Sequence, residues 1–260
     1  MASGQSPITR HQSPFVKGRI VIPCELIDLG LIGYAEAWAL QKRLVTARKA
    51  GAIENVVLLC EHPHVITQGR NGKRENLLAS ENVLRQKGVE FHATDRGGDI
   101  TYHGPGQIVG YPILNLAAIR RDVVWYVRML EEAMIRATAE FGIAAVRVPG
   151  KTGIWVQRGA TEEKLAAIGV HLSRWVTSHG FAYNLSTDLR YFDLIVPCGI
   201  ADRKPTSLEK LLGHSVKRDE VAPRIAKYFG EVFGLELREV SRADFLEQLE
   251  HAEQPLAALA

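Results

Sequence analysis

Cys198 is the residue best suited to act as a nucleophile. It lies in a Pro-Cys-Gly turn, which can present a thiol at the edge of a pocket, whereas Cys24 and Cys60 fall in apolar runs typical of buried strands. A cysteine attacks as its thiolate, so a cation or a base must lie close to it. The interpretation that requires no chemistry is a buried cysteine in a turn.

Four residues could supply that cation or base: Lys164, His103, His171 and His179. Lys164 precedes a run of apolar residues, and an ammonium group held toward a dry pocket can have a lowered pKa and accept a proton. A solvated lysine at the start of a strand is the ordinary alternative. The chemistry therefore requires Lys164 and Cys198, which are distant in the sequence, to meet in the fold.

The segment 96–107, with the sequence RGGDITYHGPGQ, combines four glycines with several polar side chains. Glycine adopts backbone conformations closed to other residues and lets other groups approach the main chain. The alternating residues 89–93 before it and the apolar residues 108–114 after it predict two strands that hold it as a loop. Functional residues often lie on such loops, so we predict a binding loop rather than a hairpin without function.

Two further motifs do not indicate ligands. Residues 61–64 (Glu-His-Pro-His) could contribute to a metal site, but a proline separates the two histidines and no further cluster lies nearby in the sequence. We interpret them as turn residues and predict no metal. Residues 150–152 (Gly-Lys-Thr) resemble part of a nucleotide-binding P-loop, but Ala145 stands where its first glycine should lie and a strand, not a helix, follows.

The composition is that of an ordinary globular protein. The chain has 260 residues, of which 46% are hydrophobic and 23% charged, and this suits one large domain or two small ones. The net charge of +3 and the lack of a long Lys/Arg block do not indicate nucleic-acid binding. They are compatible with a modest basic patch that binds an acidic protein partner. Three cysteines without C-x-x-C spacing predict reduced thiols and favour a cytoplasmic protein.

The start of the chain does not match the pattern of a signal peptide. Residues 1–14 are polar and lack the apolar core of a signal peptide, and no later run holds eighteen apolar residues, so we expect no membrane contact. We predict that residues 1–17 form a flexible N-terminal extension, residues 18–252 a single domain and residues 253–260 a frayed tail.

Strands and helices alternate irregularly, which favours an α+β domain with a mixed sheet over a parallel, doubly wound one. In the helix expected over 122–141, the periodicity places Val124 toward the core and Glu131 toward water. The other predicted helices cover 34–49, 80–87, 219–233 and 241–251, with a short one from 206. The predicted strands cover 19–22, 55–60, 108–114, 144–148, 154–156, 163–172, 176–185 and 235–240.

Four segments, in this order and spacing, closely resemble the octanoyltransferases of lipoate biosynthesis. They are residues 96–107, residues 164–169 (KLAAIG), residues 179–184 (HGFAYN) and residues 197–200 (PCGI). Residues 61–63, 69–70 and 153–156 also match the family, and Asp99 and Leu165 fill positions that vary in it. The resemblance spans roughly residues 18–212.

The resemblance implies a fold like the catalytic domain of biotin and lipoate protein ligases. It implies transfer of an octanoyl or lipoyl group from acyl carrier protein to the acceptor lysine of a lipoyl domain, in a 2-oxoacid dehydrogenase complex or the glycine-cleavage H protein. Residues 18–252 would then be a single acyltransferase domain. The protein would be a cytoplasmic monomer that needs no cofactor and binds neither nucleic acid nor membranes.

The resemblance also assigns roles to residues. Cys198 would attack the donor thioester to form an acyl-enzyme, and Lys164 would activate the thiol and later deprotonate the incoming amine. Three segments would line the acyl and carbonyl site: Arg96, Gly97, Gly98, Asp99, Ile100, Thr101, Tyr102 and His103; Ala167, Ile168 and Gly169; and Gly180, Phe181 and Ala182.

Two alternatives stay open at this point. An ATP-dependent lipoate or biotin protein ligase would share the fold and use a lysine, but it would not need a reactive cysteine at position 198. An acyl-binding module without enzymatic activity would bind the chain and form no covalent adduct. The lack of an ATP motif favours the transferase, because a thioester donor is already activated.

Overall fold

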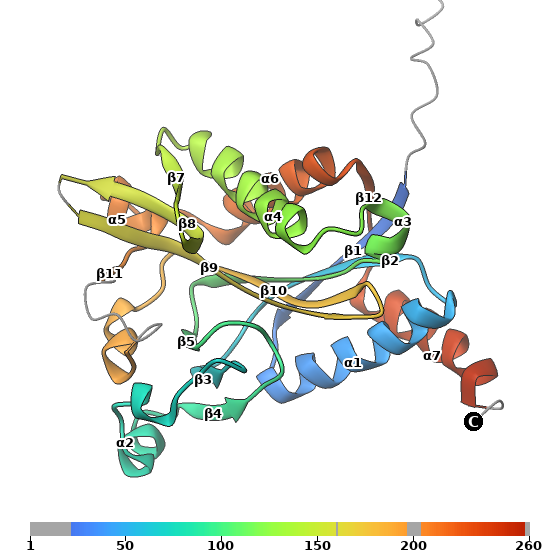
Figure 1. Ribbon diagram of the computed structural model, residues 1–260, viewed down its shortest axis with the longest axis horizontal. Coiled ribbons are helices and arrows are strands. Elements are labelled where there is room, and N and C mark those ends of the chain that lie inside the picture. The colour runs from blue at the N-terminus through green and yellow to red at the C-terminus, as the bar shows by residue number, and fades with distance from the viewer. Residues whose placement is uncertain (1–21, 160, 197–203, 258–260) are drawn as a thin grey trace, which may run out of the picture.

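A mixed β-sheet crosses the middle of the molecule in the computed structural model, which describes residues 22–159, 161–196 and 204–257 (Figure 1). Within these residues the sheet has nine strands in the order β12-β1-β2-β6-β10-β9-β8-β7, and β11 pairs with β9. Strand β1 runs parallel to β12 and β2, and the β6, β10, β9 and β8 neighbours are antiparallel. The strands are β1 (Ile22–Leu31), β2 (Asn55–Glu61), β6 (Gln107–Ile113), β7 (Ala145–Val148), β8 (Lys151–Arg158), β9 (Thr161–Ser173), β10 (Val176–Asn184), β11 (Lys204–Pro205) and β12 (Leu235–Glu239).

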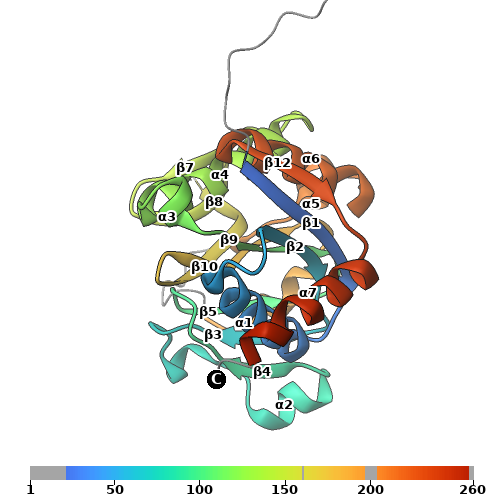
Figure 2. The ribbon, with the colours of Figure 1, turned by 90° about the vertical axis from the view of Figure 1, so that its right-hand side faces the viewer.

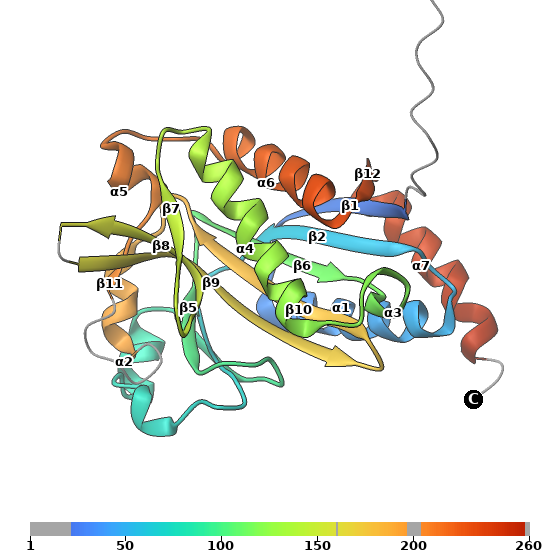
Figure 3. The ribbon, with the colours of Figure 1, turned by 45° about the horizontal axis from the view of Figure 1, so that its top comes forward.

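Helices cover both faces of this sheet. Figure 2 shows α4 and α6 above the sheet and α1 with α7 below it, and in Figure 3 α4 and α6 lie across the strands. The helices are α1 (Tyr34–Ala50), α2 (Glu81–Gln86), α3 (Leu116–Ile119), α4 (Val123–Ala139), α5 (Leu208–Leu212), α6 (Arg218–Phe233) and α7 (Arg242–Ala257), with 3-10 turns η1 (Arg74–Asn76) and η2 (Leu189–Leu194).

The two apolar cores follow from the alternation of side chains along the strands. On β2, Val57 and Leu59 pack with the core that includes α4 and α6, whereas Val56, Leu58 and Cys60 pack with the core that includes α1 and α7. Because both faces are buried, β2 is a continuous apolar run rather than an alternating one.

A second, small sheet lies below the main one in Figure 1, next to α2. It has the order β4-β3-β5 and is formed by β3 (Val65–Gln68), β4 (Glu90–Ala93) and β5 (Ile100–His103). Its own apolar cluster contains Ile66, Leu84 and Tyr102. This sheet presents the polar segment around residue 96 to the main sheet.

The predicted α+β fold with a mixed sheet is confirmed, as are most of its elements. The helices expected over 34–49 and 219–233 are α1 and α6, and both end at a glycine in the left-handed conformation. The expected hairpin is β9 and β10, which pair in register. Of the strand expected over 19–22, only Ile22 is described, and β1 continues from there to Leu31.

Segment 96–107 is not a single loop, so that prediction was wrong. Residues Ile100–His103 form β5, which pairs antiparallel with β3. Ile100 and Tyr102 are fully buried in the small sheet, and this burial overrides the local excess of glycine and polar residues. The loop is therefore two short connections, on either side of β5.

Two details of helix α4 were also predicted wrongly. Val124 is 69% exposed, whereas the carboxylate of Glu131 is fully buried. Glu131 accepts hydrogen bonds from Arg128 (2.7 Å), Arg147 (3.1 Å) and the backbone of Gly153 (3.0 Å), so its charge is compensated inside the protein. Periodicity alone cannot reveal such a compensated charge.

The C-terminal residues form more structure than expected. Helix α7 continues to Ala257, and Glu253 pairs with Arg43 of α1 at 2.6 Å. Residues 253–257 are thus helical rather than a frayed tail. None of the described helices combines the length and the apolar character needed to cross a lipid bilayer.

Candidate active site

Two of the segments predicted to bind the substrate face each other across one strand pair. In the β9–β10 ladder, Gly169 is the register partner of Gly180, Ile168 of Phe181 and Ala167 of Ala182. The third segment is tied to the same strand, because the backbone N–H of Gly97 donates to Val170 O at 2.8 Å. Pairing and one tether therefore bring all three segments together.

These segments enclose one pocket, with about 920 Å³ of space out to its open mouth. Its lining combines apolar side chains with a few polar groups, as small-molecule sites do. The predicted residues that line it are Arg96, Gly98, Asp99, Ile100, Thr101, His103, Lys164, Ala167, Ile168, Gly169, Gly180, Phe181 and Ala182. The pocket therefore contains every described residue that the sequence predicted for the site, except Gly97 and Tyr102.

Gly97 and Tyr102 support the pocket from outside. Tyr102 is fully buried, its hydroxyl lies 2.7 Å from His64 Nδ1, and its ring stacks on Tyr191. Because alternate residues of a strand point to opposite faces, Thr101 and His103 face away from Tyr102. Tyr102 holds β5 in place rather than forming the pocket wall.

Eight pocket residues were not among those assigned to line the site, although His179 was a candidate base and Gln107 ends the predicted binding loop. Gln107, His179 and Asn184 flank the predicted binding residues within the matched motifs, and this position was a usable signal. The other five come from distant elements and carry no local signal: Tyr34, Val109, Tyr111, Phe192 and Pro205.

Lys164 lies in the pocket wall on β9, half-buried, with its Nζ 4.9 Å from the ring centroid of Trp155. A cation over an indole face is stabilised by the ring electrons. Gly153 makes room for it, since a Cβ there would lie 3.3 Å from Lys164 Cε and 2.3 Å from Ala166 O. Gly153 also has φ +103°, a conformation that other residues rarely adopt.

Cys198, the predicted nucleophile, lies outside the described residues, but the chain on both sides is described. Before it, the backbone N–H of Val196 donates to Asn76 O at 2.7 Å. After it, β11 places Pro205 in register with Lys164, and Pro205 itself lines the pocket. Both ends of that segment are therefore anchored to described parts of the structure.

The two described cysteines are unsuited to nucleophilic attack. Cys24 and Cys60 are both buried, and burial raises the pKa of each thiol far above its ordinary value. A thiol that stays protonated is a poor nucleophile. Their prediction as core residues is confirmed.

His103 cannot supply a cation near neutral pH. It is buried, and burial, followed by the charges of His62 and Arg96, lowers its pKa to about 3. Its Nδ1 lies 2.8 Å from Gln107 Oε1. The imidazole is therefore a neutral, fixed part of the wall.

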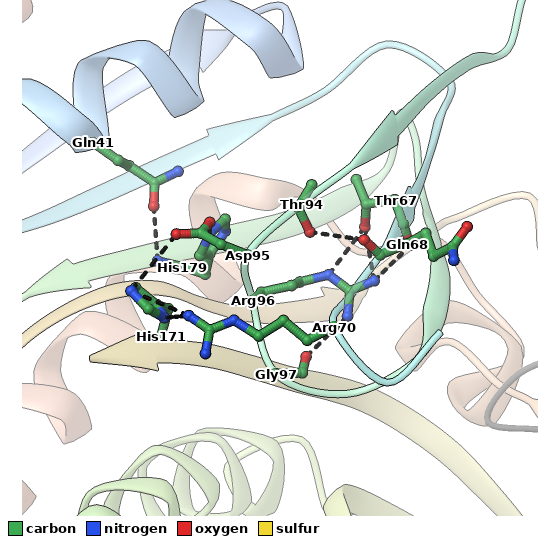
Figure 4. A network of polar contacts seen from close by, with 10 residues as sticks. All are labelled: Gln41, Thr67, Gln68, Arg70, Thr94, Asp95, Arg96, Gly97, His171 and His179. Carbon is green, nitrogen blue, oxygen red and sulfur yellow. Dashed lines mark hydrogen bonds and ion pairs between the residues drawn. The ribbon is translucent and has the colours of Figure 1, made fainter. Parts of the chain in front are cut away.

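His171 and His179 share one carboxylate, as Figure 4 shows. Asp95 Oδ1 lies 2.8 Å from His179 Nε2, and its Oδ2 lies 3.6 Å from His171 Nε2, while Arg70 Nη2 contacts Nδ1 of the His171 ring. Burial lowers the pKa of both imidazoles. His171 does not line the pocket, and His103 and His179 line it but are buried. Lys164 lines the pocket and is only half-buried, so it is the best placed of the four candidate bases.

Arg96 organises the wall opposite β9. Its Nη2 donates to Thr67 O (2.6 Å) and Thr67 Oγ1 (2.9 Å), as drawn in Figure 4. Two glycines pack tightly around it: a Cβ at Gly69 would lie 2.9 Å from Arg96 Nη1, and a Cβ at Gly169 would lie 2.9 Å from Gly97 O. These glycines allow the two sheets to approach each other.

The histidines near the start of β3 have structural partners. His62 is buried, with Nδ1 2.7 Å from Ile32 O and Nε2 2.7 Å from the Tyr111 hydroxyl. No group of three or more His, Cys, Asp or Glu side chains within residues 22–159, 161–196 and 204–257 is arranged to hold a metal ion.

The fold is that of the lipoate protein ligases. A bipartite lipoate protein ligase from Thermoplasma acidophilum, described with its E2 lipoyl domain, has a TM-score of 0.69 at 16% identity, over 90% of this chain and 92% of that one. Lipoate-protein ligase A bound with ATP has a TM-score of 0.67 at 14% identity, over 91% and 94%. At such identities the likeness shows the fold alone.

The sequence defines the family more closely. The chain belongs to the lipoyl protein ligase A/B catalytic domain family, whose model matches residues 33–230, and within it to the octanoyltransferases. It is 54% identical to an octanoyltransferase from Acidobacterium capsulatum, over 80% of this chain and 89% of that protein. It is 53% identical to one from Solibacter usitatus, over 82% and 94%. The predicted resemblance is confirmed.

Proposed function

We propose that this octanoyltransferase moves an octanoyl or lipoyl group from acyl carrier protein to the acceptor lysine of a lipoyl domain, through a thioester on Cys198. The relatives named octanoyltransferase support the acyl group. The lipoyl domain described with the archaeal ligase of the same fold supports the acceptor. The lipoyl domains of 2-oxoacid dehydrogenase complexes and the glycine-cleavage H protein are the acceptors, and the enzyme acts as a cytoplasmic monomer without ATP.

The observation that carries this proposal is the position of Lys164. Its side chain lines an apolar pocket beside Pro205, which follows the thiol-bearing segment and pairs with Lys164 itself. A lysine at the wall of such a pocket can exchange protons with a thiol and with an incoming amine.

In the first half-reaction, the Cys198 proton passes to the Lys164 amine and the thiolate attacks the carbonyl carbon of the donor thioester. The carbon–sulfur bond of the donor breaks, and the carrier thiol leaves with the proton from Lys164. One thioester replaces another, so this step needs no external energy source.

In the second half-reaction, the neutral amine of the acceptor lysine attacks the carbonyl carbon of the acyl-enzyme, and Lys164 takes the proton that this nitrogen loses and passes it to the Cys198 sulfur. The carbon–sulfur bond to Cys198 breaks, the thiol regains its proton, and an amide forms. Amide formation from a thioester is favourable and drives the whole transfer.

The apolar lining supplies the affinity for the acyl chain. An eight-carbon acyl group carries about seven methylene or methyl groups, which are worth about 5 kcal/mol when fully buried at about 0.8 kcal/mol each. Ile100, Val109, Ile168, Phe181 and Phe192 provide apolar surface for it. One carbon more or less would change binding by only about tenfold.

The test is intact-mass measurement after mixing the purified enzyme with octanoyl-acyl carrier protein in the absence of ATP. We expect one octanoyl increment, which is absent in Cys198→Ser and forms much more slowly in Lys164→Ala. Cys24→Ala, which removes a buried thiol, is the matched control and keeps the increment. An increment that survives Cys198→Ser, or transfer to a lipoyl domain that requires ATP, would refute the proposal.

A further inference from the structure

A chain of buried hydrogen bonds runs from Arg96 to the main chain of Lys164. Arg96 donates to Thr67 Oγ1, which lies 3.4 Å from His103 Nε2, and His103 Nδ1 lies 2.8 Å from Gln107 Oε1. Beyond these residues, Gln107 Nε2 donates to Asn184 Oδ1 (2.9 Å), Asn184 Nδ2 to Thr206 O (2.9 Å), and Thr206 N to Lys164 O (2.9 Å). Thr67, His103, Gln107, Asn184 and Thr206 are all buried.

Only one orientation of Asn184 and Gln107 satisfies this chain. Thr206 O is a carbonyl and can only accept, so Asn184 must present its amide nitrogen there and its oxygen toward Gln107. Gln107 must then present its nitrogen, which also donates to Tyr102 O at 3.3 Å. Its remaining oxygen faces His103, so the imidazole proton lies on Nδ1.

The hydrogen bonds at the Arg96 end of this chain are consistent with the same orientation of Gln107. Arg96 has only donors, and its Nε and Nη2 both point at Thr67 Oγ1. The Thr67 hydroxyl hydrogen is therefore free to donate to the unprotonated His103 Nε2. Every bond in the chain thus runs in a direction fixed by groups at its two ends.

The segment that this chain holds next to Lys164 has only a short pairing with β9 in the part of the chain that the structure describes. Strand β11 has two residues, and one of them is Pro205, which has no backbone N–H to pair with β9. Thr206 follows it directly, and its N–H donates to Lys164 O while its carbonyl accepts from Asn184. Among the described residues, the Asn184 side chain thus holds the Thr206 carbonyl in the peptide beside Lys164.

We propose that Asn184, oriented by Gln107, is a positioning residue that sets the place of Lys164 in the pocket through the main chain of Thr206. This inference rests on the proposed role of Lys164 in the transfer. Asn184 acts through hydrogen bonds to two neighbours and not by proton transfer, so its loss should change the rate of transfer more than the binding of the acyl donor.

The test variant is Asn184→Asp, which keeps the size and changes one donor. At high pH the introduced carboxylate would turn a negative oxygen toward Thr206 O, where a donor is required. Burial and that carbonyl favour the neutral carboxylic acid, which can donate to Thr206 O as the amide did. We therefore expect a variant that works at low pH and fails as pH rises.

The readout is octanoyl transfer to a lipoyl domain at pH 5.5 to 8.5, as a ratio to wild type and per folded enzyme measured by circular dichroism. At pH 8.5 we expect kcat to fall by about 10²-fold, the loss typical of a misplaced catalytic group, with KM for octanoyl-carrier protein changed less than about threefold. The ratio should recover toward one at pH 5.5.

Two further variants make the result specific. Asn55→Asp buries a carboxyl on β2 of the same sheet, where the side-chain oxygen accepts from Arg48 (3.1 Å) and Asn115 N (3.0 Å) and the amide nitrogen has no acceptor among the described residues. No donor is lost there, so its pH profile should follow wild type. Gln107→Glu removes the donor to Asn184 and should repeat the pH-dependent loss, which keeps the test valid if Asn184→Asp does not fold.

The inference is wrong if folded Asn184→Asp and Gln107→Glu keep wild-type kcat at pH 8.5, or if they lose the same activity at every pH. Failure of the thiol mechanism has a different signature. In that case the wild-type enzyme would transfer octanoyl without forming a mass increment on Cys198. The effect of Asn184→Asp on transfer can still be measured by the same assay, so the two failures can be told apart.

Discussion

The buried imidazole of His103 should make the fold sensitive to acid, and the size of the effect follows from its pKa. In the folded protein this pKa is lowered to about 3, mainly by burial, from an ordinary value of 6.5. As pH falls below 6.5, the unfolded chain takes up a proton at His103 and the folded protein does not. Stability attributable to this group is therefore complete above pH 6.5 and is lost progressively down to about pH 3.

The expected loss can be worked out for a convenient pH interval. At pH 5 the solution is about 1.5 units below the ordinary pKa of the unfolded histidine, and each unit is worth about 1.36 kcal/mol. Between pH 7.5 and pH 5, protonation therefore stabilises the unfolded chain by about 2 kcal/mol relative to the folded protein. The group is buried, so solvent does not screen this difference. A loss of this size is a substantial part of the stability of an ordinary domain.

The perturbation that isolates this effect is His103→Asn. Asparagine cannot titrate, but its amide nitrogen can occupy the place of Nδ1 and still donate to Gln107 Oε1. The smaller side chain will lower stability at every pH, so the informative quantity is the change between pH 7.5 and pH 5. Urea unfolding should give a loss about 2 kcal/mol smaller in His103→Asn than in wild type.

His62 and His179 also have pKa values lowered by burial, so some acid sensitivity will remain in the variant. His214→Asn replaces an exposed histidine and serves as the control, with the same acid loss as wild type. If His103→Asn loses as much stability as wild type between the two pH values, the imidazole is not held neutral and the directed hydrogen-bond chain is wrong.

Three further predictions concern other parts of the fold. Glu131→Leu should lower the free energy of unfolding in urea by about 2 kcal/mol, since it leaves the buried backbone N–H of Gly153 without its acceptor, whereas the partly exposed Arg128 and Arg147 can be solvated. Gly153→Ala should reduce octanoyl transfer at least about tenfold, because its methyl group would displace the strand of Lys164, whereas Gly150→Ala, also at positive φ but with open space around it, should keep the transfer rate. Glu253→Ala should cost less than about 1 kcal/mol in the same urea assay, as expected for an exposed ion pair with Arg43, and should speed hydrogen exchange only at the end of α7.

The sequence was informative where the pocket is built from contiguous residues. Ala167 and Ala182 each belong to a matched motif, and both line the pocket because pairing of β9 with β10 brings the two motifs together. Tyr34, Tyr111 and Phe192 reach the same pocket from three separate elements. No local pattern marks such residues, because only the tertiary fold makes them neighbours.

The errors share a physical cause: the elements that pack against a segment decide where its side chains lie, and residue type and spacing alone do not reveal those elements. Glu131 was assigned to the surface because it is charged, yet partners from another helical turn, β7 and β8 compensate its charge inside the protein. Tyr102 was assigned to the site as part of the matched segment 96–103, but in the fold its ring packs in the core of the small sheet with Ile66 and Leu84. Both outcomes depend on which elements pack against the segment.

The glycines near residues 97 and 169 let parts of the protein itself approach each other, which the sequence pattern did not predict. The segment around Gly97 and Gly98 was predicted to bind because glycines let another group approach the main chain. Around Gly169 the group that approaches is part of the protein, since the carbonyl of Gly97 and the side chain of Arg96 pack where a Cβ would stand. The close approach brings the small sheet against β9, and the pocket forms between them. Glycine thus shapes the site indirectly, by letting two sheets meet closely enough for Lys164 and Arg96 to line opposite walls of one pocket.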